Sequence, residues 1–447
     1  MSRTLGRLEL ILLGIGAIIG AGVFVLTGVV AATKAGPGVA LSFVISGLAC
    51  TLTALAYAEL AAAIGGCGGA YGYAYAGLGE IVAWAIGWAL TLEYGLAVAA
   101  VAVGWSGYVN NALASIGMEI PSALLYSPAE GGVANVPAAA IIVTLGILLI
   151  IGVRSTATFN AMIVAVKLIA IVTFLVVAAG DFELANWNPY LPFGVSGVLG
   201  GAALVFFAYI GFDAVATAAE EARDPQRDIP AGILASLGLC TLLYVAVAAV
   251  LTGAAPYTTL DNPSPVAAVL LDLGHRFAAG LVAAGALAGL TSVMLVCYYA
   301  QTRVIYAMAR DGLLPPVFTQ LHASRGTPVV SIVLSGICIT LVAAMVPLTR
   351  IAELVNMGTL AAFTVVCLGV VSLRITHPEL PRPFRAPLSP WLPLAGAAFC
   401  LLLMVYLPLF TWIGFASWMV LGLLLYSAYG YRHALIGIRP EAGQPAT

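Results

Sequence analysis

Two apolar segments of the chain carry helix-breaking residues near their midpoints. In the first segment, four glycines fall within nine residues: Gly14, Gly16, Gly20 and Gly22. The second contains the run Phe206–Asp213, in which a glycine and then an acid lie well inside an apolar stretch. Small residues also allow close helix packing. However, matched break signals in two segments favour two interrupted helices.

An interrupted helix exposes backbone groups that can bind a solute. In hydrocarbon, broken helices are tolerated only where they line a cavity, because every N–H and C=O needs a partner. The N–H groups at a helix start attract an anion, and the carbonyls at a helix end attract a cation. A free amino acid carries both charges. Two facing breaks therefore predict a site for a zwitterionic solute that needs few charged side chains.

Lys167 is an ionisable residue in the middle of another apolar segment, flanked by Val166 and Leu168. A charge in such a position costs several kcal/mol by insertion scales (~3 kcal/mol). Because burial disfavours the ammonium form, this amine is a candidate for taking up and releasing a proton near physiological pH. The alternative is a permanently charged lysine that pairs with a carboxylate.

Two further acids and one charged cluster need both a functional and a structural interpretation. Asp213 follows the second break and either gates an inner path and senses pH, or caps the half-helix that begins there. Glu59 lies late in an apolar segment, and we interpret it as structural. The cluster from Glu220 to Asp228 is interpreted as a solvated face, with an inner gate as the alternative.

The composition places these residues in a lipid bilayer. Of 447 residues, 62% are hydrophobic and 8% are charged, with 17 basic and 19 acidic side chains and a net charge of −2. Soluble domains have about 25% charged residues. These values exclude a soluble enzyme and, without a basic tract, a nucleic-acid-binding protein. The seven cysteines show no metal-ligand spacing, so we expect no metal and no cofactor.

Twelve segments are long enough, or nearly so, for a helix to cross the hydrocarbon, which takes about 20 apolar residues. The sequence therefore predicts an all-α polytopic membrane protein. The segments are Leu10–Ala32, Val39–Ile64, Ile81–Asn110, Val136–Ile151, Phe159–Ala179, Val195–Ala219, Ile229–Leu251, Phe277–Ala309, Val329–Val346, Ile351–Leu373, Trp391–Leu407 and Thr411–Tyr431. The two break signals lie in the first and sixth segments, which are equivalent positions if the first ten form two five-helix halves of opposite topology.

Basic residues predict the orientation of the chain. Thirteen of the 17 lie on the side of the N-terminus and three on the other, with Lys167 in the middle of the membrane. By the positive-inside rule, both termini are cytoplasmic. We expect one transmembrane domain over residues 1–435, with spans 1–5 at about 10–179, spans 6–10 at about 195–373 and spans 11–12 at about 391–431. Residues 436–447 are expected to form a disordered cytoplasmic tail, and a bacterial inner membrane is the expected location.

Several motifs, in order along the chain, resemble the amino acid–polyamine–organocation (APC) superfamily. They are closest to its cationic amino acid transporter branch and to the bacterial proton-coupled homologues. The matching stretches are Gly14–Phe24, Tyr57–Leu60, Gly68–Tyr71, Phe207–Asp213, Glu220–Pro230 and Gln301–Gly312. The segment Ile64–Cys67 departs from the family pattern, in which a proline and a Ser or Ala are expected. The resemblance implies a leucine-transporter-like fold: a five-plus-five inverted repeat with two extra helices, discontinuous spans 1 and 6, and transport by alternating access.

The resemblance also implies roles for individual residues. The substrate carboxylate would bind N–H groups near Ile18. The substrate ammonium group would bind carbonyl groups at the break in the sixth span. The residues concerned are Gly20, Ala21 and Gly22 for the carboxylate, and Phe207, Ala208 and Ile210 for the ammonium. Phe207 corresponds to the aromatic residue that closes over the substrate; the alternative is an ordinary core aromatic.

Two ionisable residues acquire coupling or specificity roles from the same resemblance. Lys167 matches a lysine whose ammonium replaces a sodium ion between spans 1 and 8, where it would hold carbonyls near Gly16 and Ile19. Glu93 matches an acid that faces the pocket and would favour a cationic side chain or carry a second proton site. The alternative for Glu93 is a protonated carboxyl group bonded to a neighbouring helix.

These observations predict a secondary active transporter that imports L-amino acids by proton symport, with H⁺, the solute and the lipid bilayer as its partners. An amino acid exchanger and a sodium-coupled symporter remain alternatives, the latter because Thr291 and Ser292 resemble a sodium-binding hydroxyl pair. All four histidines lie in loops or at span ends, which argues against a membrane redox enzyme. The sequence decides neither the side-chain preference nor whether a small membrane protein or a sterol-like lipid also binds.

Overall fold

The computed structural model describes residues 6–64, 71–72, 79–114, 117–118, 120–152, 157–213, 215, 222–322 and 325–434. Every regular element in this part of the chain is helical. Seven helical stretches there are long and apolar enough to cross a membrane: Gly22–Ala63, Glu80–Ala114, Asn160–Asp181, Gln226–Ala254, Arg276–Arg310, Leu348–Thr376 and Leu409–His433. Four shorter apolar helices accompany them: Val136–Ile151, Gly194–Tyr209, Val329–Met345 and Trp391–Val405.

Each of the twelve predicted segments overlaps one principal helix. These helices are α1 (Arg7–Ile18), α3 (Val39–Ile64), α5 (Glu80–Ala114), α7 (Val136–Ile151), α8 (Ala157–Ala178), α9 (Gly194–Val205), α11 (Pro225–Ala254), α13 (Arg276–Arg310), α14 (Val329–Met345), α15 (Leu348–Thr376), α16 (Trp391–Val405) and α17 (Leu409–Leu425). The number of membrane crossings and the inverted repeat remain predictions. The tail predicted at 436–447 lies outside the described residues.

The remaining elements are short helices and turns. They are η1 (Gly22–Leu26), α2 (Thr27–Val30), η2 (Ala31–Ala35), η3 (Gly36–Gly38), α6 (Ser122–Leu125), η4 (Pro128–Glu130), η5 (Ala179–Asp181), η6 (Leu184–Trp187), η7 (Phe206–Tyr209), η8 (Tyr257–Thr259), α12 (Pro265–Asp272), η9 (Pro316–Thr319), η10 (Tyr426–Gly430) and α18 (Tyr431–His433). The loop before α7 is therefore less irregular than its prolines and glycines suggest, because α6 and η4 both lie within it.

Local sequence signals explain where several helices begin and end. Asn135 caps α7, since its side-chain oxygen accepts a hydrogen bond from Ala138 N at 3.1 Å. The same helix ends at Gly152, whose φ of 89° is the left-handed conformation that favours glycine. At 35 residues, α5 and α13 are each about 52 Å long, well over the ~30 Å of hydrocarbon, as expected for tilted or protruding spans.

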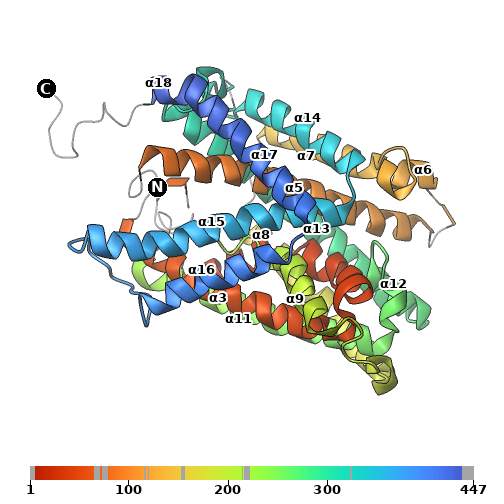
Figure 1. The fold of residues 1–447 in the computed structure, drawn as a ribbon. Coiled ribbons are helices and arrows are strands. Elements are labelled where there is room, and N and C mark those ends of the chain that lie inside the picture. The colour runs from red at the N-terminus through yellow and green to blue at the C-terminus, as the bar shows by residue number, and fades with distance from the viewer. Residues whose placement is uncertain are drawn as a thin grey trace, which may run out of the picture.

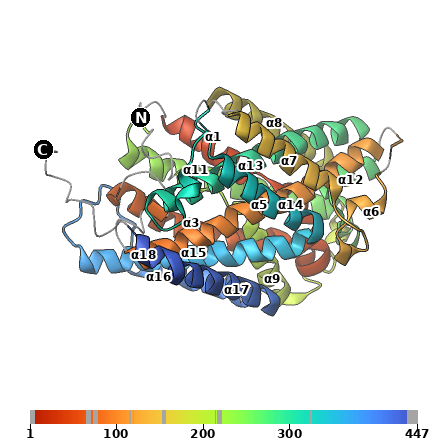
Figure 2. The ribbon, with the colours of Figure 1, turned by 90° about the horizontal axis from the view of Figure 1, so that it is seen from above.

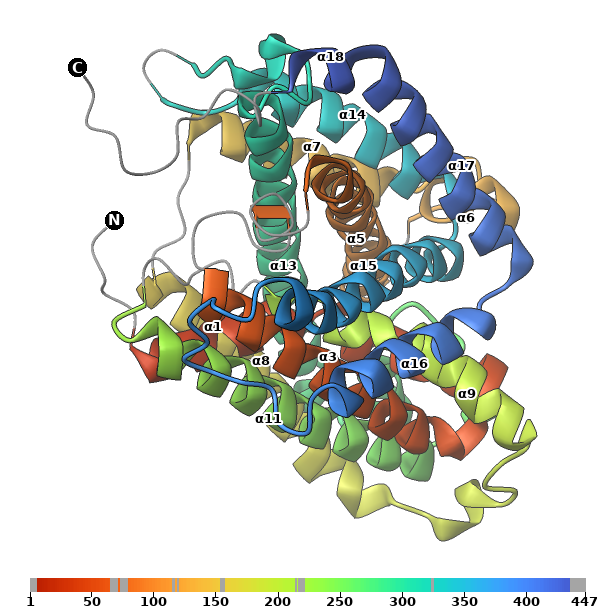
Figure 3. The ribbon, with the colours of Figure 1, turned by 60° about the vertical axis from the view of Figure 1, so that its left-hand side comes forward.

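The helices run broadly alongside one another (Figure 1). Helix α5 lies at the centre of the bundle, packed between α13 and α15 (Figure 3). Helices α1, α3 and α11 pack together on one side, and α17 runs along the outside (Figure 2). Both termini lie at one end of the bundle, and α6 and α12 lie at the other (Figure 1). The broken segments face the central helix α5 from the side of α1 and α9.

Candidate functional site

The first break comes directly after α1. This helix ends at Ile18, and Ile19 adopts an extended conformation with φ −72° and ψ 106°. The helix resumes at Gly22 with the wide turn η1. The first N–H groups of a helix have no partner within it. The N–H groups of Gly20, Ala21 and Gly22, predicted to bind a carboxylate, therefore lie where a helix begins again.

The second break follows α9. The helix tightens into η7, after which Ile210 is extended, with φ −59° and ψ 135°. Gly211 has a φ of 111°, and a Cβ atom there would lie 2.8 Å from the carbonyl oxygen of Ala17. Both the backbone angle and the close approach require glycine. Sequence analysis predicted both interruptions, and both are present.

The two breaks touch each other through their backbones. A Cβ atom at Gly22 would overlap Ala208, approaching its backbone nitrogen to 3.0 Å. One side chain, Tyr244 of α11, also links the two segments. Its hydroxyl group lies 2.9 Å from Ile18 O and 3.0 Å from Ala208 O, and it donates its hydrogen bond to this pair of carbonyls. Sequence analysis missed Tyr244, although a tyrosine in the middle of an apolar span was a usable signal.

Lys167 lies against the first break. Its Nζ donates hydrogen bonds to Gly16 O at 2.7 Å and to Ile19 O at 2.9 Å, and the side chain is fully buried. Its methylene carbons pack against Gly289 of α13, where a Cβ atom would lie 2.9 Å from them. The ammonium group therefore lies between the first span and α13, as predicted. The two carbonyls that it binds flank the end of α1.

A second group of ionisable side chains lies next to the second break. Tyr94 donates a hydrogen bond to Asp213 Oδ2 at 3.0 Å. Glu93 interacts electrostatically with Asp213, and the hydroxyl group of Thr359 in α15 donates its hydrogen bond to Val355 O at 3.0 Å. Both carboxylates are buried, with 2% of Glu93 and 5% of Asp213 exposed. The interaction of Glu93 with Asp213 is what a shared proton site requires.

Comparison with known proteins identifies the family. A family model described as amino acid permease matches residues 5–426. The chain belongs to the amino acid permease family. It is therefore a multi-pass membrane transporter of the APC superfamily rather than an enzyme.

Three relatives illustrate the range of the family. The permease is 46% identical over 438 residues to the methylthioribose transporter of Bacillus subtilis (strain 168). The aligned region covers 98% of this chain and 95% of that protein. It is 44% identical over 441 residues to the branched-chain amino acid permease BcaP of the same bacterium, covering 97% and 94%. It is 37% identical to cationic amino acid transporter 4, vacuolar, of Arabidopsis thaliana, covering 85% of this chain and 64% of the relative.

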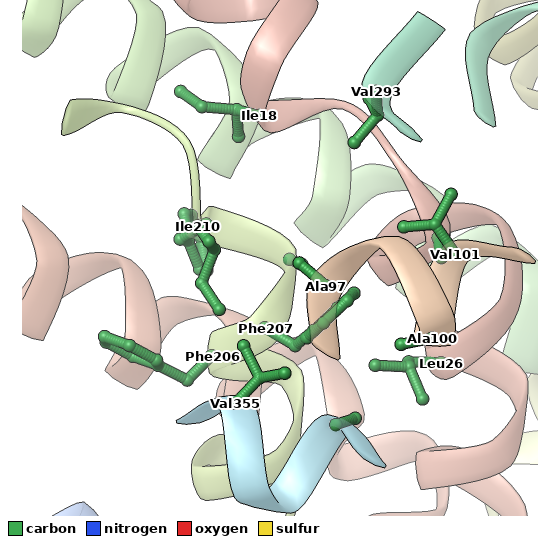
Figure 4. Packing of buried hydrophobic residues seen from close by; sticks show 14 of the residues in the cluster. Ile18, Leu26, Ala97, Ala100, Val101, Phe206, Phe207, Ile210, Val293 and Val355 are labelled. Atoms are coloured by element: carbon green, nitrogen blue, oxygen red, sulfur yellow. The ribbon is translucent and has the colours of Figure 1, made fainter. Parts of the chain in front are cut away.

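Apolar side chains surround the two breaks of the permease. Ile18, Phe207 and Ile210 lie around the broken segments, together with Val293 of α13 and Val355 of α15 (Figure 4). Val293 lies 3.5 Å from the position that a Cβ atom of Gly20 would take. Sequence analysis did not single out Val293 or Val355, because nothing distinguishes them from other valines in apolar spans. Phe207 is 6% exposed, which fits either interpretation of this ring.

One member of the hydroxyl pair that suggested a sodium site, Thr291, forms hydrogen bonds within the protein. Thr291 Oγ1 donates to Leu287 O at 2.7 Å and accepts a hydrogen bond from Trp105 Nε1 at 3.0 Å. Hydroxyl groups in helices commonly bond back to the preceding turn in this way. Among the described residues, no three His, Cys, Asp or Glu side chains are grouped as metal ligands.

Glu59 is bonded to α15 and to the segment before α16. Its carboxylate receives two hydrogen bonds from Arg374 of α15, at 2.8 and 2.6 Å, and one from Ala386 N at 2.7 Å. Arg382 Nε lies 3.6 Å from the same carboxylate. The structure therefore supports the structural interpretation of Glu59. Of the predicted inner cluster, Glu220 and Glu221 lie outside the described residues, as does the variant segment around Cys67.

Proposed function

We propose that this permease imports L-amino acids by proton symport through alternating access. The observation that carries the proposal is the pair of adjoining helix breaks with the Lys167 ammonium group bound to Gly16 O and Ile19 O. The resumed helix at Gly22 offers N–H groups to a carboxylate, and the segment at Ile210 offers carbonyls to an ammonium group. These backbone groups recognise what all α-amino acids share.

The surroundings of the breaks support a neutral, apolar substrate side chain. Aliphatic side chains, among them Ile18, Val293 and Val355, lie around the broken segments, and one relative is named as a branched-chain amino acid permease. Glu93 supports a cationic substrate as the alternative, in line with the relatives named as cationic amino acid transporters. Its burial beside Asp213 makes it the weaker argument, because a carboxyl group that interacts with a second acid within the protein is less available to a substrate.

The position of Lys167 supports protons rather than sodium as the coupling ion. Its ammonium group occupies the space between the first break and α13, so a sodium ion there would have to displace it. A lysine in apolar surroundings can lose its proton. The neutral amine then binds the two carbonyl groups more weakly than the charged ammonium group does. Proton release would thereby loosen the first span and couple the pH gradient to the movement of the broken helices.

The test is uptake by purified permease in liposomes. We expect a proton gradient, imposed without sodium, to drive accumulation of labelled L-leucine or L-isoleucine above the equilibrium level, and a protonophore to abolish it. L-arginine in the same assay tests the role of Glu93. Counterflow without net uptake would establish an exchanger, and accumulation only with sodium would overturn proton coupling.

Labelled methylthioribose belongs in the same panel as a second candidate substrate. The relative named as its transporter covers nearly the whole chain, and exposed peptide groups can also bind sugar hydroxyls. Accumulation of methylthioribose with no uptake of any amino acid would show that the substrate is a neutral solute and not a zwitterion.

A further inference from the structure

Asn356 is a fully buried amide on helix α15, which packs against the central helix α5. Its Nδ2 donates hydrogen bonds to Ala203 O at 2.8 Å and to Leu204 O at 3.0 Å. Both residues belong to the last turn of α9, directly before the second break. The last four carbonyl groups of an α-helix have no partner in a following turn of the same helix. Asn356 therefore binds the backbone of the sixth span where its first half ends.

This contact has the same form as the contact of Lys167 with the first break. Each is a buried nitrogen that donates to two carbonyl oxygens near the end of the first half of a broken span. Lys167 follows its two carbonyl partners by 151 and 148 residues, and Asn356 follows its own by 153 and 152. In the predicted inverted repeat, the segments that carry them are the fifth and the tenth, the last of each half. The two side chains are therefore counterparts in that repeat.

The two counterparts differ in their chemistry. A lysine amine can release its proton, whereas an asparagine amide is neutral and keeps its two N–H donors throughout the physiological pH range. A further donor to the same half of the sixth span, Ser46 of α3, bonds Ala202 O at 2.7 Å, and its hydroxyl group is neutral as well. The contact at the first break thus responds to a proton, and the contact of Asn356 at the second break does not.

Stability alone does not account for an asparagine at this position. Its Oδ1 has no hydrogen-bond partner among the residues that the structure describes. A buried polar atom without a partner lowers stability, and an apolar side chain of similar size would avoid that loss. Helix α15 contacts both α9 and η7, and Val355 lies beside Phe206 and Phe207 (Figure 4). The donor end of the amide is therefore the part that matters, and it acts on the second break.

We propose that Asn356 is a positioning residue of the solute site, which keeps the second break in place whatever the charge of Lys167. The role rests on the proposed function, in which the second break binds the ammonium group of the solute. Proton release by Lys167 weakens the contact at the first break and leaves the contact of Asn356 intact. The half of the site that binds the solute carboxylate then moves relative to the half that binds its ammonium group.

Hydrogen–deuterium exchange of the solute-free permease in lipid nanodiscs tests the contact itself. Asn356→Leu keeps a similar size but removes the donor. We expect exchange of the amides in 203–210 to become about tenfold faster, as two lost hydrogen bonds predict, while exchange in 14–22 stays unchanged. Lys167→Met should give the reverse pattern. Glu93 and Asp213 are the titratable groups next to the second break, so all samples are measured at one pH.

Two further variants control this measurement. Thr364→Val removes a hydroxyl group that donates to Leu360 O at 2.8 Å within α15, two turns beyond Asn356, and it should change exchange in neither segment. Asn356→Ser, whose hydroxyl group is too short to reach both carbonyls, replaces Asn356→Leu if the latter does not fold.

The consequence for the solute is measured in the same preparations and in liposomes. We expect Asn356→Leu to raise the Kd of labelled L-leucine about tenfold, while the rate of counterflow at saturating L-leucine stays within about twofold of the wild-type rate. The pH dependence of uptake should keep its wild-type midpoint, because the amide does not titrate. Thr364→Val should leave the Kd unchanged.

Unchanged exchange in 203–210 would overturn the proposal, as would faster exchange spread equally over both breaks or an unchanged Kd for L-leucine. Local loosening of 203–210 in a permease whose wild-type chain binds no amino acid would have a different meaning. Asn356 would then still hold the second break, and the proposed transport function would be refuted instead.

Discussion

At the scale of single residues, Lys167 and Tyr244 satisfy carbonyl groups that the broken helices leave exposed. Both side chains are buried, and each is bonded to two carbonyl oxygens. An unpaired buried polar group costs about 1–3 kcal/mol, and more when it is charged. The two side chains therefore stabilise a backbone geometry that the hydrocarbon would not otherwise tolerate. They differ in that only the lysine can change its charge.

Lys167→Met tests the coupling role of this charge. The substitution keeps an unbranched apolar stem but removes the ammonium group from Gly16 O and Ile19 O. We expect uptake driven by a proton gradient to fall at least tenfold, corresponding to about 1.4 kcal/mol or more, while counterflow persists. Proton-driven accumulation and counterflow are measured in the same liposomes. Full pH-driven accumulation by the variant would remove Lys167 from the coupling mechanism.

Tyr244→Phe tests the link between the two breaks. Loss of one hydroxyl group leaves Ile18 O and Ala208 O without this donor, at a cost of about 1–3 kcal/mol. We expect the KM for L-leucine uptake to rise about tenfold, because these carbonyls belong to the segments that hold the solute. Tyr298→Phe is the matched control, since Tyr298 donates to Ile332 O at 2.6 Å between α13 and α14, away from the breaks. Equal effects of both variants would indicate a general loss of stability.

At the scale of elements, the two interrupted spans hold their shape because glycines allow backbone to meet backbone. Gly211 is needed for its positive φ and for its approach to Ala17, and Gly22 is needed for its contact with Ala208. A binding site made of peptide groups keeps its geometry only if the distance between the two broken segments stays the same. The sequence therefore encodes the site mainly through residues that lack side chains.

Gly22→Ala tests this requirement for close approach. The added methyl group would overlap Ala208, so the two broken segments must separate. We expect L-leucine uptake to fall by about tenfold or more, as overpacking of a filled site typically costs 1–3 kcal/mol. Gly200→Ala in α9 is the matched control, because a Cβ atom there meets nothing within 4 Å. Normal uptake by Gly22→Ala would show that the segments do not hold the solute in this arrangement.

Glu59 joins three elements at the end of the bundle that holds the termini: α3, α15 and the segment before α16. Its carboxylate is buried and bonded to Arg374 and to Ala386 N. We expect Glu59→Gln to lower the free energy of unfolding by roughly 3 kcal/mol, because removing one partner leaves the other charge poorly compensated. Thermal unfolding in detergent measures the loss, and Glu59→Gln combined with Arg374→Gln should recover part of it. An unchanged melting temperature with lost transport would make Glu59 functional instead.

At the scale of the whole molecule, the sequence predicted the helices and the positions of the breaks, and the reasons are physical. Apolar length determines where a helix can lie in a bilayer, and the glycine runs identify where it can open. The contact of Lys167 with Gly16 and Ile19 was predicted from the family resemblance, and it is present. Val293 was not predicted, because it acts through three-dimensional proximity and looks like an ordinary residue of an apolar span. Tyr244 was not predicted either, although a tyrosine inside an apolar span was a signal for it. The short helices α6 and η4 were missed because prolines that begin a short helix look like loop residues in the sequence.

The sidedness of the molecule is the remaining prediction at this scale, and it follows from the distribution of basic residues. Both termini lie at the same end of the bundle (Figure 1), as the predicted even number of crossings implies. Thirteen of the 17 basic residues lie on that side by the predicted span order, so the positive-inside rule places it in the cytoplasm. We expect green fluorescent protein fused after residue 434 to fluoresce in bacterial cells and alkaline phosphatase fused there to be inactive. The two reporters should give the reverse pattern when inserted between Met118 and Ile120, at the opposite end. An active phosphatase at the C-terminus would show that the membrane orientation is the reverse of the predicted one.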